Sequence, residues 1–282
     1  MVPRAIYGSL KTIGRTIMGT YRDFAVTIAE KAGELLKERL HEKHHIDFKG
    51  EIDIVTDVDR MSEELLLSLI TRAYPHHDVL TEESLGRQSG ARQRWIIDPI
   101  DGTTNYAHGF PFFCVSVALE EEGQITVGVV YNPILQEMFV AERGKGAFWN
   151  GRRISVSEKG TLAKGFLATG FPYDIGHDPN NNINYFSGMA LKSLAIRRAG
   201  SAAMDLAYVA AGRFDGFWEL KLHPWDTAAG WLLVEEAGGR VTDISGNDYF
   251  LLAGSILATN GVLHDEMIQA LGTINPLDER LC

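Results

Sequence analysis

The chain has 282 residues, of which 45% are hydrophobic and 23% are charged, and its formal net charge is -10. This composition is typical of a globular protein and excludes a disordered or fibrous chain. The length suits one large domain or two closely packed lobes, and the acidic balance argues against a general nucleic-acid binder, so no nucleic-acid partner is expected.

The two cysteines, Cys114 and Cys282, form no C-x-x-C motif, which favours a reduced, cytoplasmic protein. Every apolar run is shorter than the roughly 18 residues needed to span a bilayer, so no membrane partner is expected. Residues 1–20 form an N-terminal extension with basic and apolar residues mixed. It lacks the continuous apolar core of a signal peptide, and we interpret it as a weakly amphipathic lead-in.

The first predicted elements are two helices separated by a polar segment. Apolar residues at helical spacing predict a packing helix over residues 21–40, and residues 41–51 are expected to form a mobile loop. Residues 53–59 lead into a second helix over 60–73, where the acidic residues before the helix could simply be caps. Residues 79–84 then form a short apolar stretch followed by two acidic residues, Glu82 and Glu83.

The central stretch, residues 95–106, combines a buried strand with an acidic loop. Three apolar residues predict the strand, and the chain then breaks at Asp98 and Pro99 into a stiff turn. Asp98, the Ile100 carbonyl and Asp101 could converge on one point, where they would suit a hard divalent cation. A phosphatase with an aspartyl nucleophile would need carboxylates two residues apart, and these are three apart. The plainer alternative is an Asp-Pro turn with a solvated carboxylate.

An anion site is indicated directly after these acids. Gly102 allows a close approach of the backbone. The N–H groups and hydroxyls of Thr103 and Thr104 could hold an anion beside the metal.

The remaining elements alternate between strands and helices, with an antiparallel meander in the middle of the chain. This order predicts layered mixed sheets and helices, a mixed α/β or α+β fold. The expected strands are 112–119, 126–131, 137–141, 147–149, 166–169, 194–198, 214–219, 240–242 and 251–258; the expected helices are 185–193, 202–211, 227–237 and 262–271; residues 150–151 form a hairpin turn and 223–226 a loop.

Residues 95–106 and 223–230 together resemble the inositol monophosphatase family of metal-dependent phosphatases. Four further blocks, 53–59, 79–84, 131–151 and 200–219, resemble that family in the expected order, so the likeness covers nearly the whole chain from about residue 21. The resemblance implies a five-layer αβαβα sandwich and a homodimer. It also implies an N-terminal α+β lobe over 21–155 and a C-terminal α/β lobe over 156–282, joined in one compact catalytic unit.

The resemblance also implies a role for each matching residue. The expected ligands of two or three Mg²⁺ ions are Glu82, Asp98, the Ile100 carbonyl, Asp101 and Asp226. Thr103 matches the residue paired with the attacking water, Asp59 matches the carboxylate that holds this threonine, and Glu82 is also placed to take the proton of the water.

The resemblance also implies which residues contact the substrate. The amides of Gly102 and Thr103 match a phosphate cradle. Positions lining the alcohol part of the substrate are matched by Gly200, Ser201, Ala202 and Glu219, with His223 nearby. Arg197 and Arg198 are either an edge-strand surface or substrate contacts.

The expected activity is hydrolysis of a small phosphate monoester of a polyol or sugar by metal-activated water, with inhibition by lithium. Inositol 1-phosphate is the favoured substrate and fructose 1,6-bisphosphate the runner-up, alone or as a second activity. Histidinol phosphate and the 3′-phosphate of a nucleotide such as adenosine 3′,5′-bisphosphate are further alternatives. A hypothesis of a different class is a protein-binding regulatory module whose phosphatase site is residual.

Overall fold

The structure, a computed structural model, describes residues 19–42, 45–50, 52–84 and 86–274. The predicted N-terminal extension up to residue 18 and Cys282 lie outside these ranges. Within the described ranges, every helix is too short or too polar to cross a lipid bilayer.

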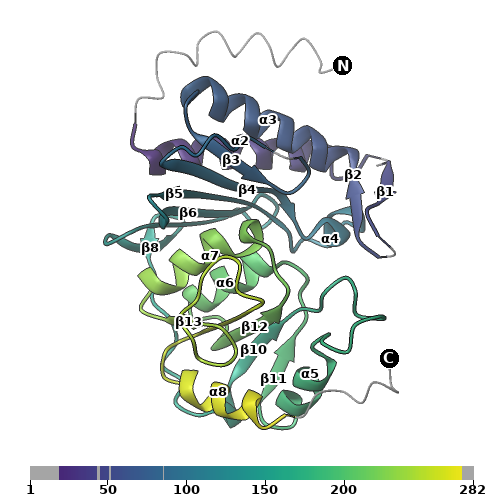
Figure 1. The fold of residues 1–282 in the computed structure, drawn as a ribbon, viewed down its shortest axis with the longest axis vertical. Coiled ribbons are helices and arrows are strands. Elements are labelled where there is room, and N and C mark those ends of the chain that lie inside the picture. Colours follow the sequence, from purple (N-terminus) through teal and green to yellow (C-terminus); the bar gives the residue numbers. More distant parts are fainter. Residues whose placement is uncertain (1–18, 43–44, 51, 85, 275–282) are drawn as a thin grey trace.

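The described chain forms five stacked layers, helices alternating with sheets (Figure 1). The outer helices of the first layer are α2 (Tyr21–Arg39) and α3 (Asp57–Ala73). They cover a sheet of seven strands in the order β3-β4-β5-β6-β7-β8-β9, with bounds Asp78–Thr81, Gln93–Asp101, Cys114–Glu121, Gln124–Asn132, Glu137–Glu142, Gly146–Trp149 and Arg152–Arg153.

The middle layer holds α6 (Ala202–Ala210) and α7 (Pro224–Glu236). Below it lies a sheet of five strands in the order β11-β10-β12-β14-β13, with bounds Ala195–Arg197, Phe166–Thr169, Gly216–Leu220, Ser255–Thr259 and Arg240–Thr242. Helices α5 (Ile183–Ala190) and α8 (His264–Gly272) cover its outer face. The predicted mixed fold and five-layer sandwich are therefore confirmed.

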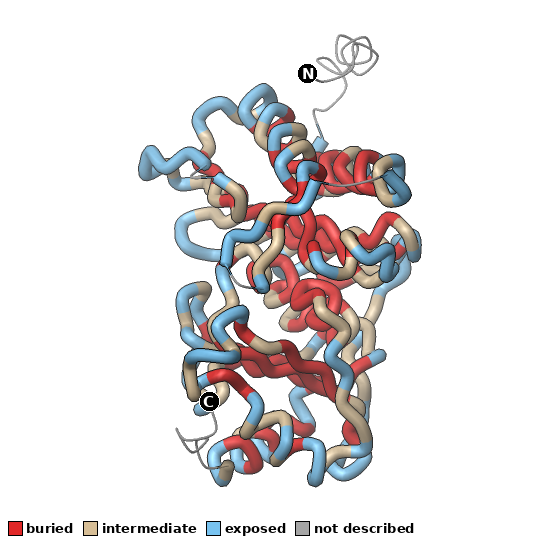
Figure 2. The backbone as a smooth tube through the Cα atoms, turned by 90° about the vertical axis from the view of Figure 1, so that its right-hand side faces the viewer, coloured by how far each residue is buried: buried red, intermediate tan, exposed pale blue. Residues whose placement is uncertain are grey.

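Strand β5 shows why the upper sheet is covered on both faces. Side chains along a strand point alternately to its two sides. Val115, Val117 and Leu119 belong to the core beneath α2 and α3, whereas Cys114 and Ala118 belong to the core around α6 and α7. All five residues are buried, and buried residues run through both sheets and the helices between them (Figure 2).

Helices α6 and α7 join the two sheets into one body, because their core contains residues of both. Two glycines permit this close approach. A Cβ at Gly128 of β6 would lie 2.7 Å from the carbonyl oxygen of Ala229, and a Cβ at Gly230 would lie 2.5 Å from Cβ of Leu206. The change from one sheet to the other falls between Arg153 and Phe166, while the expected division into lobes at residue 155 stays a prediction.

Three expectations about local structure were wrong. The segment 41–51 is not entirely loop, because β1 (Ile46–Phe48) pairs antiparallel with β2 (Ile54–Thr56). The Asp98–Asp101 segment belongs to strand β4 rather than to a loop. Residues 224–226 form the first turn of α7, with Pro224 at a position where its missing N–H costs no helical hydrogen bond.

Candidate active site

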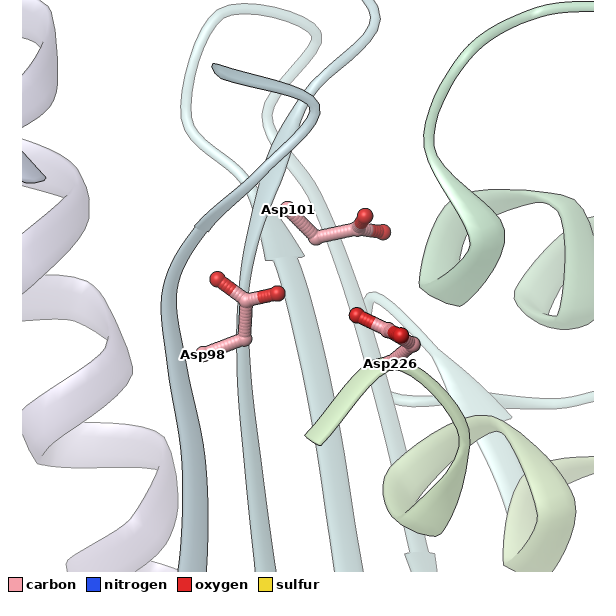
Figure 3. A group of neighbouring side chains, drawn as sticks. All are labelled: Asp98, Asp101 and Asp226. Atoms are coloured by element: carbon pink, nitrogen blue, oxygen red, sulfur yellow. The ribbon is translucent and has the colours of Figure 1, made fainter. Parts of the chain in front are cut away.

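Three aspartates meet at the boundary between the upper sheet and the middle helices. Asp98 and Asp101 come from β4 and Asp226 from the first turn of α7, and the three side chains point toward one another (Figure 3). One carboxylate oxygen of each lies within 4.8 Å of those of the other two. Asp98 and Asp101 are buried.

An irregularity in β4 explains how two residues three apart share one face. In a regular strand, residues at odd spacing point to opposite sides. Here Asp98 pairs with Ser116 and Asp101 with Cys114, so three steps along β4 match two steps along β5. The extra residue is a bulge, and it turns both carboxylates toward the middle helices.

Hydrogen bonds from the backbone and from one hydroxyl fix the aspartates. The amide of Ile100 donates to Oδ1 of Asp98 at 2.9 Å. Asp101 Oδ2 accepts from Ser201 Oγ at 2.6 Å and from the Ala203 amide at 2.7 Å, both at the start of α6.

The third aspartate is held by its own helix. The His223 amide donates to Asp226 Oδ2 at 2.7 Å, as part of the capping box that begins α7. The His223 ring stacks on Trp225 with 4.8 Å between ring centroids. Asp226 is therefore fixed within the first helical turn.

The electrostatics of the cluster fit a divalent cation. Burial, followed by the charges of Glu82, Asp101 and Asp226, raises the pKa of Asp98 well above its ordinary value. Burial and the charge of Asp101 do the same to the pKa of Asp226. Carboxylates that repel one another out of water need a compensating positive charge, and oxygen donors are what Mg²⁺ or Ca²⁺ prefers.

Glu82 lies next to this cluster but outside the 4.8 Å group. It follows β3, and its Oε1 accepts from Lys49 Nζ at 2.9 Å, while the same ammonium donates to Glu83 Oε1 at 2.6 Å. Burial raises the pKa of Glu82 to about 7, against the opposing effect of the Lys49 charge. The charge of Glu82 also raises the pKa of Asp98, which places the two carboxylates in one electrostatic environment.

Thr103 and Asp59 form a pair beside the aspartates. The Thr103 hydroxyl lies 2.8 Å from Asp59 Oδ1 and 3.0 Å from the Ile100 carbonyl oxygen. Asp59 Oδ2 accepts from the Thr56 amide at 2.8 Å and from its hydroxyl at 2.5 Å, which forms the capping box of α3. Asp59 is thus both a helix cap and a partner of Thr103.

A cavity of about 380 Å³ opens beside the aspartates. Asp101 and Asp226 line one part of it. The other residues that line it include Gly102, Gly170, Arg198, Gly200, Ser201, Ala202, Asp205, Glu219 and His223.

Two glycines shape this cavity. Gly102 has φ 95°, and a Cβ there would lie 3.0 Å from the Gly200 carbonyl oxygen. At Gly170 a Cβ would lie 2.1 Å from Glu219 Oε1. Glycine therefore lets the backbone pass close to the Gly200 carbonyl at the first position and to the Glu219 carboxyl group at the second.

Two residues expected at the site lie elsewhere. Thr104 is exposed on the short helix α4 (Thr103–Ala107). Arg197 is exposed, with its guanidinium 4.8 Å from the centroid of the Phe166 ring. Arg198, the other arginine of the pair, lines the cavity.

Sequence reasoning missed Asp205, which lines the cavity from α6. It is 1% exposed, and its Oδ1 is a buried oxygen without a hydrogen-bond partner. Burial, followed by the charge of Glu219, raises its pKa well above the ordinary value. A lone acid among the apolar residues of this helix was the available signal, because an unpaired buried carboxylate is costly.

A buried carboxylate cluster beside a polar cavity, in a five-layer αβαβα fold, is the arrangement of a metal-dependent phosphatase. The chain belongs to the inositol monophosphatase family, whose model matches residues 18–275. The resemblance seen in the sequence is confirmed, and the chain is a phosphoric monoester hydrolase of a metal-dependent family.

Individual relatives agree with this assignment. The chain is 44% identical over 245 residues to the Nus factor SuhB of Pseudomonas aeruginosa, which covers 84% of this chain and 90% of that protein. It is 44% identical over 251 residues to the inositol-1-monophosphatase of Mesorhizobium japonicum, covering 87% and 94%. The crystal structure of the extragenic suppressor protein suhB from Bartonella henselae matches with a TM-score of 0.85 and 43% identity, covering 89% and 98%.

The buried Glu219 predicts a pH dependence of stability. Burial raises its pKa to about 8, opposed by Arg198, whereas an unfolded glutamate titrates near 4.5. The folded chain therefore binds the proton on Glu219 more tightly than the unfolded chain does. The stability that the proton supplies is complete below pH 4.5 and is lost as pH rises through about 8, at about 1.4 kcal/mol per pH unit between these values.

Urea denaturation of wild type and Glu219→Gln in chelator, from pH 5 to 9, measures this effect. The free energy of unfolding of the wild type should fall relative to the Gln variant as pH rises. The exposed Glu38→Gln is the control and should track the wild type. A constant difference between wild type and Glu219→Gln would contradict the prediction.

Proposed function

We propose that this protein hydrolyses inositol 1-phosphate to inositol and phosphate with magnesium as cofactor. The observation that carries the proposal is the convergence of three aspartates within 4.8 Å, next to a cavity that also contains Glu219. This arrangement offers cation ligands on one side and an acceptor for substrate hydroxyls on the other.

We assign the metal ligands to Glu82, Asp98, the Ile100 carbonyl, Asp101 and Asp226, for two or three Mg²⁺ ions. The donor set is all oxygen and crowded with negative charge, which suits a hard cation. When bound, magnesium neutralises phosphoryl oxygens and lowers the pKa of water. Lithium, as a competing small cation, is expected to inhibit.

Thr103 is the residue proposed to orient the attacking water. Its single hydroxyl proton is directed to Asp59 or to the Ile100 carbonyl, so its oxygen lone pairs can accept from water. Asp59 cannot rotate away, because two bonds from Thr56 hold its other oxygen. Glu82, together with the Thr103–Asp59 pair, is proposed to take the proton of the water.

Substrate recognition is divided along the cavity. The amides of Gly102 and Thr103 are proposed to hold the phosphate close to the aspartates. Glu219 is proposed to hydrogen-bond with hydroxyls of the polyol ring, since its carboxyl group can accept from a hydroxyl in either protonation state. Ser201 donates to Asp101, so its role there is to position the carboxylate.

Arg198 supports the runner-up substrate, fructose 1,6-bisphosphate. It lines the cavity and could bind a second phosphate. Glu219 and Asp205 line the same cavity, however, and their carboxyl groups can exchange hydrogen bonds with substrate hydroxyls, which inositol offers in place of a second phosphate. We therefore rank inositol 1-phosphate first, ahead of fructose 1,6-bisphosphate, histidinol phosphate and adenosine 3′,5′-bisphosphate.

Substitution of Asp98 tests the metal-dependent mechanism. Asp98→Asn should reduce turnover by more than about a hundredfold. Mutation of a residue that only supports a metal ligand already lowers activity by about 10- to 100-fold, and Asp98 is proposed to be a ligand itself. The measurement is phosphate release at saturating magnesium, with circular dichroism to check the fold. Asp265→Asn, whose side chain is 86% exposed on α8, is the control and should be fully active. Near-normal turnover by folded Asp98→Asn would refute the mechanism.

A phosphate-release panel with the four substrates tests the ranking. Inositol 1-phosphate should have the highest kcat/KM, because its hydroxyls match the carboxyl groups of the cavity. Arg198→Gln should lower kcat/KM for the bisphosphate more than for inositol 1-phosphate, since only the bisphosphate has a second anionic group. A preference of more than about tenfold for the nucleotide would overturn the ranking.

A second candidate function is protein binding in a regulatory complex. The observation that favours it is the name of one relative, a Nus factor, which describes that protein. Pull-down from lysate with wild type and Asp98→Asn separates the two roles. Partners retained by the inactive variant would establish a binding surface independent of catalysis, and loss of every partner would exclude one.

Two further proposals rest on the sequence. A homodimer is expected from the family resemblance, and a cytoplasmic location from the absence of a C-x-x-C motif. Sedimentation velocity at several protein concentrations would measure the first, and fractionation of cells the second.

A further inference from the structure

An irregular segment, residues 171–182, forms one wall of the active-site cavity. It connects β10 to α5, and residues 171–174 all line the cavity. The segment begins against Glu219, because a Cβ at the preceding Gly170 would lie 2.1 Å from Glu219 Oε1. Residues 171–174 therefore bound the part of the cavity that contains Glu219.

The two ends of the segment are held together by Asn182, which is fully buried. Its Nδ2 donates to the Thr169 hydroxyl at 2.8 Å and to the Gly170 carbonyl at 2.5 Å. Its Oδ1 accepts from the Trp218 indole at 2.7 Å. These bonds anchor the ends of the segment at β10 and β12, but anchored ends alone do not fix the middle of a loop.

Lys221 fixes the middle of the segment. Its Nζ donates to Asp174 Oδ2 at 2.7 Å and to Asp178 Oδ2 at 2.6 Å. Lys221 lines the cavity two residues after Glu219, and its amide donates to the Gly254 carbonyl at 2.9 Å, so its backbone is anchored to the lower sheet. A single exposed ion pair restrains little, whereas one ammonium shared by two carboxylates of the same segment restrains both.

Lysine is an unusual residue for position 221. Its φ of 60° lies in the left-handed region, where the Cβ of any residue other than glycine is crowded by the backbone. Glycine would adopt this conformation without strain. Strained backbone positions are concentrated at functional sites, which indicates that the lysine is needed for its side chain.

We propose that Lys221 is a specificity-determining residue that limits the size of the alcohol in the cavity. By holding Asp174 and Asp178, it positions residues 171–174 as a fixed wall. The inference rests on the proposed function, which places the alcohol part of the substrate beside Glu219. The cavity of about 380 Å³ is near the lower end of the range for small-molecule pockets, about 300 to 1,000 Å³, so a polyol ring fits while a nucleoside must displace the wall.

Two substitutions of Lys221 separate the ion pairs from the backbone strain. Lys221→Met removes the ammonium and keeps the strain, whereas Lys221→Gly removes both and should resist urea better than the Met variant. Both should raise kcat/KM for adenosine 2′-monophosphate, relative to inositol 1-phosphate, by about tenfold, mainly through a lower KM for the nucleotide. Lys192→Met, at an exposed lysine after α5, is the control and should keep the wild-type ratio.

The other half of the ion-pair cluster provides a second test. Asp174→Asn with Asp178→Asn should raise the same ratio, and adding Lys221→Met to this pair should change it little further, because the same interaction is already lost. Hydrogen exchange of the amides of residues 171–178 should be faster in both Lys221 variants than in the wild type. This second measurement does not depend on activity.

Two results would overturn the proposal. The first is an unchanged substrate ratio in both Lys221 variants, whether or not hydrogen exchange becomes faster. The second is a loss of kcat/KM confined to fructose 1,6-bisphosphate, which would show that Lys221 itself binds a second phosphate.

Glycerol 2-phosphate, a smaller substrate, separates this proposal from the proposed function. A wild-type preference for it over inositol 1-phosphate would contradict the proposed substrate. The ratio of nucleotide to glycerol 2-phosphate would then test Lys221 in the same way, and a rise of about tenfold in both Lys221 variants would support the size limit.

Discussion

The repulsion among three crowded carboxylates, two of them buried, is the constraint on which this structure depends. Asp98, Asp101 and Asp226 would be destabilising in the interior without donors and a cation. A bulge in β4 orients Asp98 and Asp101, and amide groups at the starts of α6 and α7 donate hydrogen bonds to Asp101 and Asp226. A cluster of carboxylates that repel one another is therefore one that the rest of the chain must stabilise.

The layer order explains why the site lies where it does. The upper sheet supplies Asp98 and Asp101, the middle helices supply Asp226 and the partners of Asp101, and the lower sheet supplies Glu219. Since α6 and α7 pack against both sheets, any shift between the sheets would change the distance from Asp98 and Asp101 to Glu219. Gly128 and Gly230 keep this spacing short.

The sequence predicted elements that are marked by local patterns, such as the spacing of apolar residues in a helix. It was less informative about features that depend on pairing between strands. Helical spacing located α2 and α3, and the resemblance located the aspartates. The β1 strand was missed because it has only three residues within a polar segment, and its stability comes from pairing with residues 54–56. The bulge in β4 depends on the register with β5, which no local pattern reveals.

Other misses have different causes. Arg197 is the last residue of β11 and lies over the Phe166 ring, whereas Arg198 follows the strand and lines the cavity; their adjacency in sequence hides this difference. Pro224, by contrast, was a readable signal, because proline is favoured at the first helical position. Asp205 was readable in the same way, as an acid within an apolar helix.

The partners of Asp101 bear on how the protein is made. Its carboxylate accepts from Ser201 and from Ala203, residues 100 and 102 positions later in the chain. During synthesis from the N-terminus, the upper sheet is complete about 50 residues before these donors leave the ribosome. Until then Asp101 lacks these two donors, so the complete hydrogen-bond set around the aspartate cluster can form only after α6 has been synthesised.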